Sequence, residues 1–249
     1  MFQPHPIFIQ PENDAIKVWR YMDFTKFVSL IDSRQLYFTR ADKFEDPFEG
    51  SFPKMNIQDR QSFFNRPEFQ GDENYGLLNL ERFHKKMAEY IAINCWHMNE
   101  HESAAMWKLY LKSDEGIAIQ STYSRLRQSF IDNKTIYLGT VKYIDYETEL
   151  IINSTNSFSP FVHKRKSFEH EKEVRALIEI LPEGDTINLN QTTIEYGIKI
   201  EVALETLIDK IYVAPSAPNW LADLVKAVVN KYEHNFEVVH SALNGRPMF

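Results

Sequence analysis

The stretch AIKVWRYMDFTKFVSLIDSRQLYFTR, residues 15–40, decides the class of fold. Residues 15–23 include Val, Trp and Tyr, which are common in strands, and therefore predict a short strand. Residues 24–33 carry apolar side chains at helical spacing, and residues 35–40 predict a second strand. A strand, a helix and a strand in so short a segment indicate that the chain opens as a mixed α and β structure.

The remaining sequence continues in the same way and then becomes richer in strands. We expect further helices at residues 77–90, 103–111, 123–133 and 219–232. We expect further strands at residues 91–96, 116–120, 134–146, 171–180, 193–200, 208–213 and 236–240. No repeat, glycine-rich linker or change in composition divides the chain, so a single α+β domain over residues 15–249 is favoured over two domains.

Two segments depart from this regular pattern. Residues 1–14 are rich in proline and are interpreted as an N-terminal arm that lies on the surface. Residues 46–74 lack a clean hydrophobic period and are interpreted as an irregular insertion, in which residues 58–65 can form a short helix.

Composition excludes several classes of protein. A chain of 249 residues with 43% hydrophobic and 14% aromatic residues is neither disordered nor collagen-like nor a simple coiled coil. The net charge of −7 gives no overall positive field for non-specific binding to nucleic acid or a membrane surface, although the run Lys164, Arg165 and Lys166 could guide a phosphate backbone. The single cysteine rules out an internal disulfide. With no signal peptide or long apolar run, we expect a cytoplasmic protein without a membrane partner.

The common catalytic and metal-binding motifs are missing. The sequence has no G-x-G-x-x-G, Walker A, G-x-S-x-G or H-E-x-x-H pattern, which disfavours Rossmann, P-loop and α/β-hydrolase enzymes. Cys95, His97 and His101 are close in sequence but match no standard zinc spacing, so no metal site is predicted. Cys95 follows an apolar run and is interpreted as a small buried residue rather than a nucleophile.

The strand expected at residues 171–180 is the most informative candidate for chemistry. Glu171, Glu173 and Arg175 alternate along it and therefore share one face, while the other face is apolar. This polar face can be a solvated surface with a Glu–Arg pair. It can also hold a carboxylate on a rigid strand beside an arginine that keeps it ionised, which is an arrangement that stabilises developing positive charge or orients a sugar hydroxyl.

Several other residues admit a structural or a functional interpretation. Arg20, Tyr21, Tyr37, Thr39 and Arg40 lie on or beside the first two strands, where they can pack or can hold a base and phosphates. The apolar residues of the helix at 103–111, namely Met106, Trp107 and Tyr110, are interpreted as a core stripe. Asp46, Pro47, Phe48 and Glu49 are interpreted as a turn, and the spacing leaves open whether a carboxylate there faces a ligand.

Taken in order, these segments resemble a bacterial family known as domain of unknown function 2971. The resemblance is carried by WRYMD (19–23), LYFTRADKFEDPFEG (36–50), CWHMNEHESAAMWKLYLKSDEGIAI (95–119) and SFEHEKEVRALI (167–178). Departures occur at Glu45, where the family commonly has Asn, and at Phe168, where it commonly has Trp.

The layout also resembles, more distantly, that of ADP-ribosyltransferases. This resemblance implies a mixed or antiparallel, split β-sheet core flanked by helices, with NAD as the substrate. On this analogy Arg20 or Tyr21 holds the adenosine ribose or the carboxamide, Tyr37 stacks on nicotinamide, and Thr39 and Arg40 are nearby contacts. Glu173, or Glu171 in its place, stabilises the oxocarbenium-like transition state.

Two hypotheses follow for the function. The first is an NAD-dependent ADP-ribosyltransferase, or an NAD glycohydrolase, that modifies a protein, RNA or DNA as a bacterial toxin or antiphage effector, with a possible antitoxin or regulatory partner. The alternative is a non-catalytic module of a defence or regulatory system that binds a nucleotide or a partner. The enzyme hypothesis requires Glu173, Tyr37 and Arg20 to line one cleft.

Overall fold

A nine-stranded, mostly antiparallel sheet organises the computed structural model, which describes residues 1–69, 73–111, 115–184 and 189–245. Along the main path the strands follow the order β11-β10-β4-β1-β3-β2-β9, and β8 pairs with both β3 and β5. Only β10 and β11 pair in parallel within this sheet, so the expected α+β fold with a mixed sheet is confirmed. The strands are β1 (Lys17–Asp23), β2 (Gln35–Arg40), β3 (Ile91–Met98), β4 (Gly116–Thr122), β5 (Tyr137–Thr140), β8 (Glu173–Glu179), β9 (Gly197–Glu201), β10 (Lys210–Val213) and β11 (Glu237–His240).

The sheet forks along one edge of β3, and this fork is the feature that positions the site. On its other edge β3 pairs with β8 from Ile91 to His97. On the forked edge, β2 pairs with β3 only near Ile93, and β1 pairs with β3 only from His97 onward. The middle of β3 therefore has no strand partner on that edge, and the expected split in the sheet is confirmed.

Helix α1 (Phe24–Ser33) bridges the two arms of the fork, and local chemistry sets both of its ends. The Asp23 carboxylate accepts a hydrogen bond from the backbone N–H of Lys26 and caps the first turn. Arg34 ends the helix in the left-handed conformation with φ of 53°. The apolar stripe that includes Phe27 and Ile31 is buried, because it packs on the sheet.

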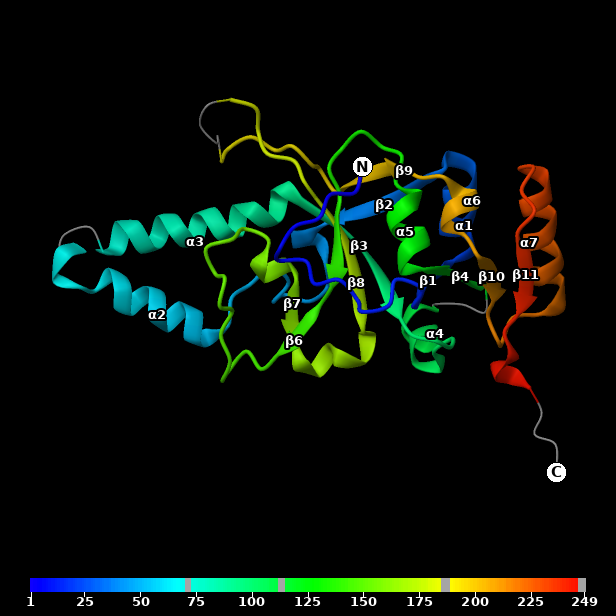
Figure 1. Cartoon of the computed structure of the whole chain (residues 1–249), viewed down its shortest axis with the longest axis horizontal. Coiled ribbons are helices and arrows are strands. Elements are labelled where there is room, and N and C mark those ends of the chain that lie inside the picture. The colour runs from blue at the N-terminus through cyan, green and yellow to red at the C-terminus, as the bar shows by residue number, and fades with distance from the viewer. Residues whose placement is uncertain (70–72, 112–114, 185–188, 246–249) are drawn as a thin grey trace.

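The other helices lie at the two ends of the sheet and over its faces (Figure 1). Helix α7 lies beside β11 at one end, and α2 and α3 project as a hairpin at the other. The α-helices are α2 (Lys54–Phe64), α3 (Glu73–Tyr90), α4 (Ala104–Tyr110), α5 (Tyr123–Ser129), α6 (Leu204–Leu207) and α7 (Asn219–Lys231). Within the described residues, no helix combines the length and apolar character needed to cross a membrane.

The segment at residues 46–74 is more helical than the sequence indicated. Helix α2 occupies much of it, and a 3-10 turn at Pro67–Phe69 follows. The helix was hard to predict because its apolar residues do not gather on one face. It is instead held by contact with α3, where the Phe64 ring lies so close to Gly76 that a Cβ there would be 2.7 Å from it.

The N-terminal segment is packed against the sheet, so the interpretation as a surface arm was wrong for its central part. Phe8 is only 3% exposed, and its ring stacks on Tyr137 of β5 at 5.4 Å. Ile9 pairs with Thr140 in an isolated antiparallel bridge. The prolines had suggested a surface arm, but burial of the apolar residues between them stabilises the segment against the sheet.

Several element boundaries also differ from the sequence predictions. The strand expected at 134–146 is divided into β5 and β6 (Lys142–Ile144), which pairs with β7 (His163–Arg165) in a separate small sheet. The expected helix at 123–133 ends at Ser129, and the expected strands at 171–180 and 193–200 begin at Glu173 and Gly197. Tertiary pairing, which local propensity does not encode, sets these limits.

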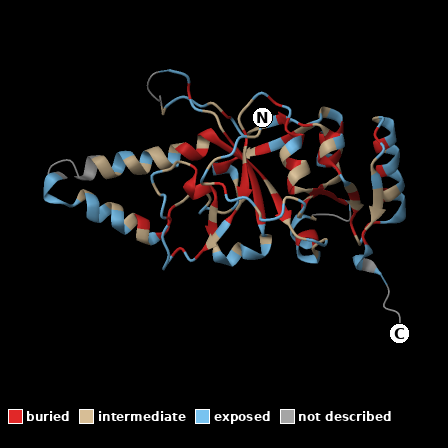
Figure 2. Cartoon of the chain, viewed as in Figure 1, coloured by how far each residue is buried: buried red, intermediate tan, exposed pale blue. Residues whose placement is uncertain are grey.

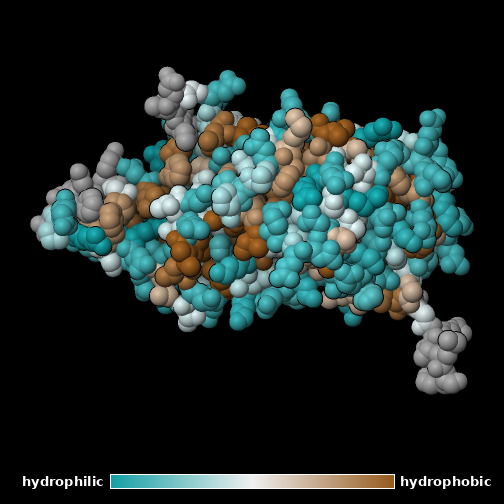
Figure 3. Space-filling view, in the orientation of Figure 1, coloured by the Kyte–Doolittle hydropathy of each residue, from teal (hydrophilic) through white to brown (hydrophobic). Residues whose placement is uncertain are grey.

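Buried residues concentrate in the sheet and under its helices, while residues 58–63 of α2 are mostly exposed (Figure 2). The main core cluster contains Trp19, Trp96 and Trp107 at 2% exposure or less. Hydrophilic residues cover most of the face in Figure 3, and hydrophobic ones gather where the hairpin joins the body. The aromatic excess of the sequence is therefore used largely in the core.

Candidate active site

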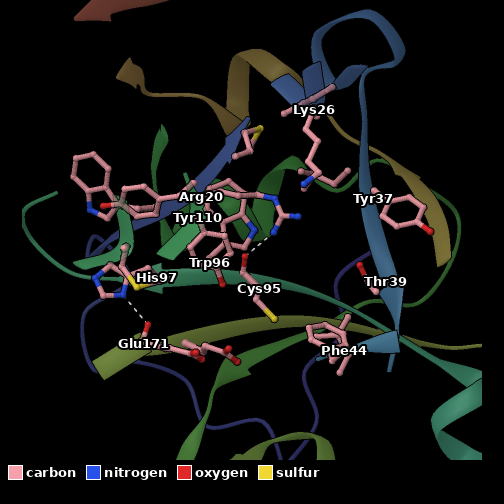
Figure 4. Close-up of a pocket in the computed structure, with 18 of the residues that line it drawn as sticks. Arg20, Lys26, Tyr37, Thr39, Phe44, Cys95, Trp96, His97, Tyr110 and Glu171 are labelled. Carbon is pink, nitrogen blue, oxygen red and sulfur yellow. Dashed lines mark hydrogen bonds between the residues drawn. The ribbon is translucent and has the colours of Figure 1, made fainter. Parts of the chain in front are cut away.

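A cavity of about 430 Å³ opens at the fork between β1 and β2. Side chains from α1, α4, β3, β8 and β9 complete its walls (Figure 4). Its volume lies within the range of about 300–1,000 Å³ that is usual for small-molecule sites. Arg20, Tyr37 and Glu173 all line this cavity, as the enzyme hypothesis required.

Arg20 reaches into the fork from β1. Its NH1 group donates a hydrogen bond of 2.6 Å to the Cys95 carbonyl, which is free to accept because the middle of β3 has no strand partner on this edge. Among the described residues, no carboxylate forms an ion pair with this guanidinium. Burial lowers the pKa of Arg20 from its ordinary value, yet an arginine stays protonated in proteins. The cavity therefore contains a half-buried cation, and several of its N–H donors have no partner among the described residues.

Glu173 supplies a carboxylate at the start of β8. Its side chain is 7% exposed and forms ion pairs with two cations. The Lys164 ammonium lies 3.0 Å from Oε1 and the Arg175 Nε lies 2.5 Å from Oε2. Burial alone would raise the pKa of Glu173, but Arg175 and Lys164 outweigh it and lower this pKa to about 2. Glu173 is therefore ionised over the whole physiological pH range.

Glu171 lies just before β8, at the end of the 3-10 helix Lys166–Glu171. Lys172 separates the two acids in the left-handed conformation with φ of 41°, which turns both carboxyl groups toward Lys164. Burial, together with a hydrogen bond to Glu173 and its negative charge, raises the pKa of Glu171. Glu171 therefore takes up a proton at a higher pH than Glu173 does.

The interpretation of the acidic strand as a solvated face was wrong. Both faces of β8 are buried, and the Arg175 side chain has no exposed surface. Arg175 donates to both oxygens of Glu49, at 2.6 and 2.9 Å, and to the Phe161 carbonyl at 2.7 Å. The turn at residues 46–50 covers this face, which the sequence pattern of β8 alone did not indicate.

Two of the candidate NAD-binding residues have other partners. Tyr21 lines the cavity, but its hydroxyl accepts a hydrogen bond of 2.8 Å from the Ser103 N–H, next to the start of α4. Arg40 does not line the cavity: its guanidinium binds both carboxylate oxygens of Asp42 and donates to the Ile194 carbonyl.

Tyr37 and Thr39 lie at the rim of the cavity on β2. Tyr37 is 43% exposed, and its ring points toward β9 in Figure 4. A Cβ at Gly197 of β9 would lie 2.4 Å from the Tyr37 hydroxyl, so this glycine provides the space that the ring occupies. Tyr37 is therefore accessible to a ligand, although its ring rests on the neighbouring strand.

Sequence reasoning missed several residues of the cavity. Met106 and Trp107 are buried as the core-stripe interpretation predicted, but Tyr110 is 46% exposed and lines the cavity close to Arg20 (Figure 4). Its place at the end of α4, one turn after Trp107, was the available signal. Lys26 of α1 and Lys199 of β9 also line the cavity, and nothing in their local sequence had indicated this.

The Cys95 and His97 side chains also belong to the cavity wall. Burial raises the pKa of the Cys95 thiol, which disfavours the reactive thiolate. The His97 Nδ1 atom donates a hydrogen bond of 2.6 Å to the Glu171 carbonyl. In the part of the chain that the structure describes, no group of three or more His, Cys, Asp or Glu residues is placed to hold a metal ion.

The basic run at residues 164–166 is mostly used inside the protein. Lys164 is buried against the two acids, and Arg165 binds Asp46 at 2.7 Å while its guanidinium lies 4.2 Å from the centre of the Phe48 ring. Only Lys166 is exposed. The run therefore offers less free charge to a phosphate backbone than its sequence suggested.

Neither a family model nor a curated protein sequence matches this chain. Two solved structures resemble it, both of DarT from Thermus sp. 2.9. The complex with ADP-ribosylated single-stranded DNA has a TM-score of 0.39 and 9% identity over 93% of this chain and 95% of that chain. The complex with carba-NAD+ has a TM-score of 0.36 and 7% identity over 92% of this chain and 96% of that chain. At these scores the likeness assigns neither an activity nor a site residue to this chain.

Proposed function

We propose that the protein is an NAD-dependent ADP-ribosyltransferase and that the forked cavity is its active site. One observation carries this proposal: the charges of the cavity are separated. Arg20 and Lys26 lie in one half and Glu171 in the other, with Cys95 between them (Figure 4). NAD has the complementary pattern, because its pyrophosphate is anionic and its nicotinamide ring is cationic.

The cationic half is suited to the pyrophosphate. Arg20 has guanidinium donors that no carboxylate of the described residues uses, and a guanidinium binds phosphate oxygens in a forked geometry. Lys199 is exposed on the same wall, and Lys26 has only a surface pair with Asp23 at 3.1 Å. These lysines can add attraction at the mouth without a large cost of desolvation.

The carboxylate half is suited to the bond that breaks. The Glu173 carboxylate is held ionised and rigid, so it can stabilise the positive charge that develops on the ribose as nicotinamide leaves. The C1′–N bond breaks and its electron pair leaves with nicotinamide, which becomes neutral. Tyr37 and Tyr110 are accessible aromatic rings that line the same cavity and can stack on the rings of NAD, and Thr39 lines the cavity as well. Tyr37 pairs with Lys199 and therefore lies on the cationic side.

Glu171 is suited to a second step, in which an acceptor bonds to C1′ and loses a proton. The raised pKa of Glu171 makes its ionised form a better base than an ordinary glutamate at neutral pH. We assign to it the proton of the acceptor, which is a nucleophilic group of a protein or nucleic acid. If water is the acceptor, the same steps hydrolyse NAD.

Such an activity is suited to a cytoplasmic toxin or antiphage effector. Modifying a macromolecule with ADP-ribose can halt an essential process, and an antitoxin or regulatory protein would then be needed to protect the producing cell. The alternative, a nucleotide-binding module without turnover, uses the same cavity and differs only in the chemistry at Glu173.

The test is nicotinamide release and transfer of label from NAD labelled in its adenosine half, incubated with the protein and a bacterial lysate. We expect label in a macromolecular fraction with wild type, and a loss of at least about 100-fold with Glu173→Gln, because the transition-state charge loses its counter-ion. Glu169→Gln, an exposed acid on the preceding 3-10 helix, is the matched control and should retain activity.

Each outcome of this test has one meaning. Label that ends as free ADP-ribose indicates a glycohydrolase. NAD that binds without being cleaved indicates the non-catalytic module. Wild-type protein that neither binds nor cleaves NAD overturns the proposal.

A further inference from the structure

We infer that Glu49, on the turn at residues 46–50, positions the Glu173 carboxylate by acting through Arg175. Glu49 touches neither the cavity wall nor, in the proposed reaction, the substrate. It acts only on the arginine that orients the acid. This inference rests on the proposed function, which it deepens by adding a positioning residue.

The contacts form an uninterrupted chain from the turn to the site. Glu49 accepts hydrogen bonds from both terminal nitrogens of Arg175, and the Nε of the same arginine donates a hydrogen bond to Glu173. The three side chains are 3%, 0% and 7% exposed, so water cannot substitute for any of them. Because a guanidinium is planar, fixing two nitrogens on Glu49 also fixes the direction in which the third points.

The turn that carries Glu49 is itself locked in place. Asp46 accepts a hydrogen bond of 3.0 Å from the Phe48 N–H and binds Arg165 at 2.7 Å. Gly50 has φ of 70°, a conformation that favours glycine, and a Cβ there would lie 2.3 Å from the Phe161 ring. The Phe161 carbonyl also accepts a hydrogen bond from Arg175. Phe161 therefore contacts both the turn and the arginine.

Charge balance gives Glu49 a second effect. Burial raises the pKa of Glu49, but its contact with both terminal nitrogens of Arg175 favours the ionised form. When Glu49 is ionised and Glu171 is protonated, the negative charges of Glu49 and Glu173 equal the positive charges of Lys164 and Arg175. Removing the charge of Glu49 leaves the network positive, which favours ionisation of Glu171. The other groups around the two acids are Tyr143 of β6, whose hydroxyl accepts from the Glu173 N–H, Tyr110 of α4, Cys95 and His97 of β3, and Arg20 of β1.

The test compares Glu49→Gln with Glu45→Gln, the same chemical change at an exposed residue of the preceding turn. For Glu49→Gln we expect kcat for nicotinamide release to fall about 10- to 100-fold while KM for NAD changes less than about threefold, because the misdirected group acts on the transition state. Glu45→Gln should match wild type. An unchanged kcat overturns the inference. So does a fall in kcat that only matches the loss of folded protein.

A titration of the carboxyl groups by 13C NMR separates this inference from the proposed function. We expect Glu49→Gln to lower the pKa of Glu171 by about one pH unit and Glu45→Gln to leave it unchanged. If wild type does not act on NAD but this shift occurs, the proposed function fails and the coupling to Glu49 stands. If NAD is cleaved and no shift or loss of kcat occurs, only the inference fails.

If Glu49→Gln does not fold, Glu49→Asp tests the positioning role of Glu49 instead. The shorter acid retains the charge but cannot hold both nitrogens of Arg175 in the same place. We therefore expect a loss in kcat of about tenfold with an unchanged pH profile. Wild-type kcat in Glu49→Asp contradicts a positioning role.

Discussion

Two arginines on opposite sides of β3, the buried Arg175 and the half-buried Arg20, differ in how the protein uses them. Arg175 on β8 donates to Glu49, Glu173 and the Phe161 carbonyl, so each nitrogen of its guanidinium has a partner. Arg20 on β1 has a single hydrogen bond, to the Cys95 carbonyl, among the described residues. Both lie close to the same cavity wall, but only Arg20 lines the cavity.

This difference separates a structural cation from a binding cation. Burying a guanidinium costs several kcal/mol unless carboxylates and hydrogen bonds compensate it. Arg175 is compensated within the fold, so its removal must damage the fold. Arg20 is not compensated by a carboxylate, so its removal should damage the binding of an anion far more than the fold.

Arg175→Met should have the largest effect on stability. It leaves the Glu49 and Glu173 carboxylates buried without their shared partner, which costs about 3–5 kcal/mol in the free energy of unfolding, or roughly 10 °C in Tm for a chain of this size. Urea unfolding followed by circular dichroism measures this loss. Stability within about 1 kcal/mol of wild type would remove the distinction between the two arginines.

Arg20→Met should weaken NAD binding strongly and change the stability of the fold little. The loss of charged hydrogen bonds to the pyrophosphate should weaken NAD binding about 10- to 150-fold, while the free energy of unfolding changes by less than about 1 kcal/mol. Calorimetric titration of NAD and the same urea series measure the two quantities. A variant that is destabilised as strongly as Arg175→Met would make Arg20 a structural residue.

Arg20→Lys should weaken NAD binding less than Arg20→Met does. An ammonium keeps the positive charge but lacks the fork that binds two phosphate oxygens at once. We expect NAD affinity between those of wild type and Arg20→Met, with a loss of about fivefold to tenfold. Affinity equal to that of wild type would show that only charge matters at this position.

The two halves of the cavity should also differ in their response to pH. NAD binding by the cationic half should be nearly constant from about pH 5 to 8, since arginine and phosphodiester groups do not titrate there. Transfer should fall as pH falls, because Glu171 has a raised pKa and loses its basic form as it takes up a proton. Glu173, with its pKa lowered to about 2, remains ionised throughout.

The pH profile of transfer at saturating NAD checks this expectation. Glu171→Gln should slow transfer and remove the acidic limb. A limb centred at the ordinary glutamate pKa, about 4.3, would contradict the account of Glu171.

Local sequence was sufficient for much of the fold. Helix α1 has the predicted bounds because Asp23 caps it and its apolar residues form one stripe. Helix α4 begins after Ser103, whose hydroxyl accepts from the Met106 N–H as a cap should. Helix α2 was only partly predicted, since contact with α3 rather than its own pattern holds it.

The site was less accessible to sequence reasoning because it depends on contacts between distant residues. Period-two alternation grouped Glu173 with Arg175, but it could not indicate that Glu49 covers them from a position 126 residues away. The partner of Arg40, Asp42, is close in sequence, yet only the structure places that pair outside the cavity. The binding and catalytic roles of Arg20, Tyr21, Tyr37, Thr39, Glu171 and Glu173 remain predictions.

We expect NAD to bind in the forked cavity with its pyrophosphate on Arg20 and its nicotinamide ribose beside Glu173. A crystal structure of Glu173→Gln with NAD tests it most directly, because this variant should bind the substrate without cleaving it. We expect phosphate oxygens about 3 Å from the Arg20 guanidinium and the ribose C1′ on the Glu173 side of Cys95. NAD bound in the reverse orientation, outside the cavity, or not at all would contradict it.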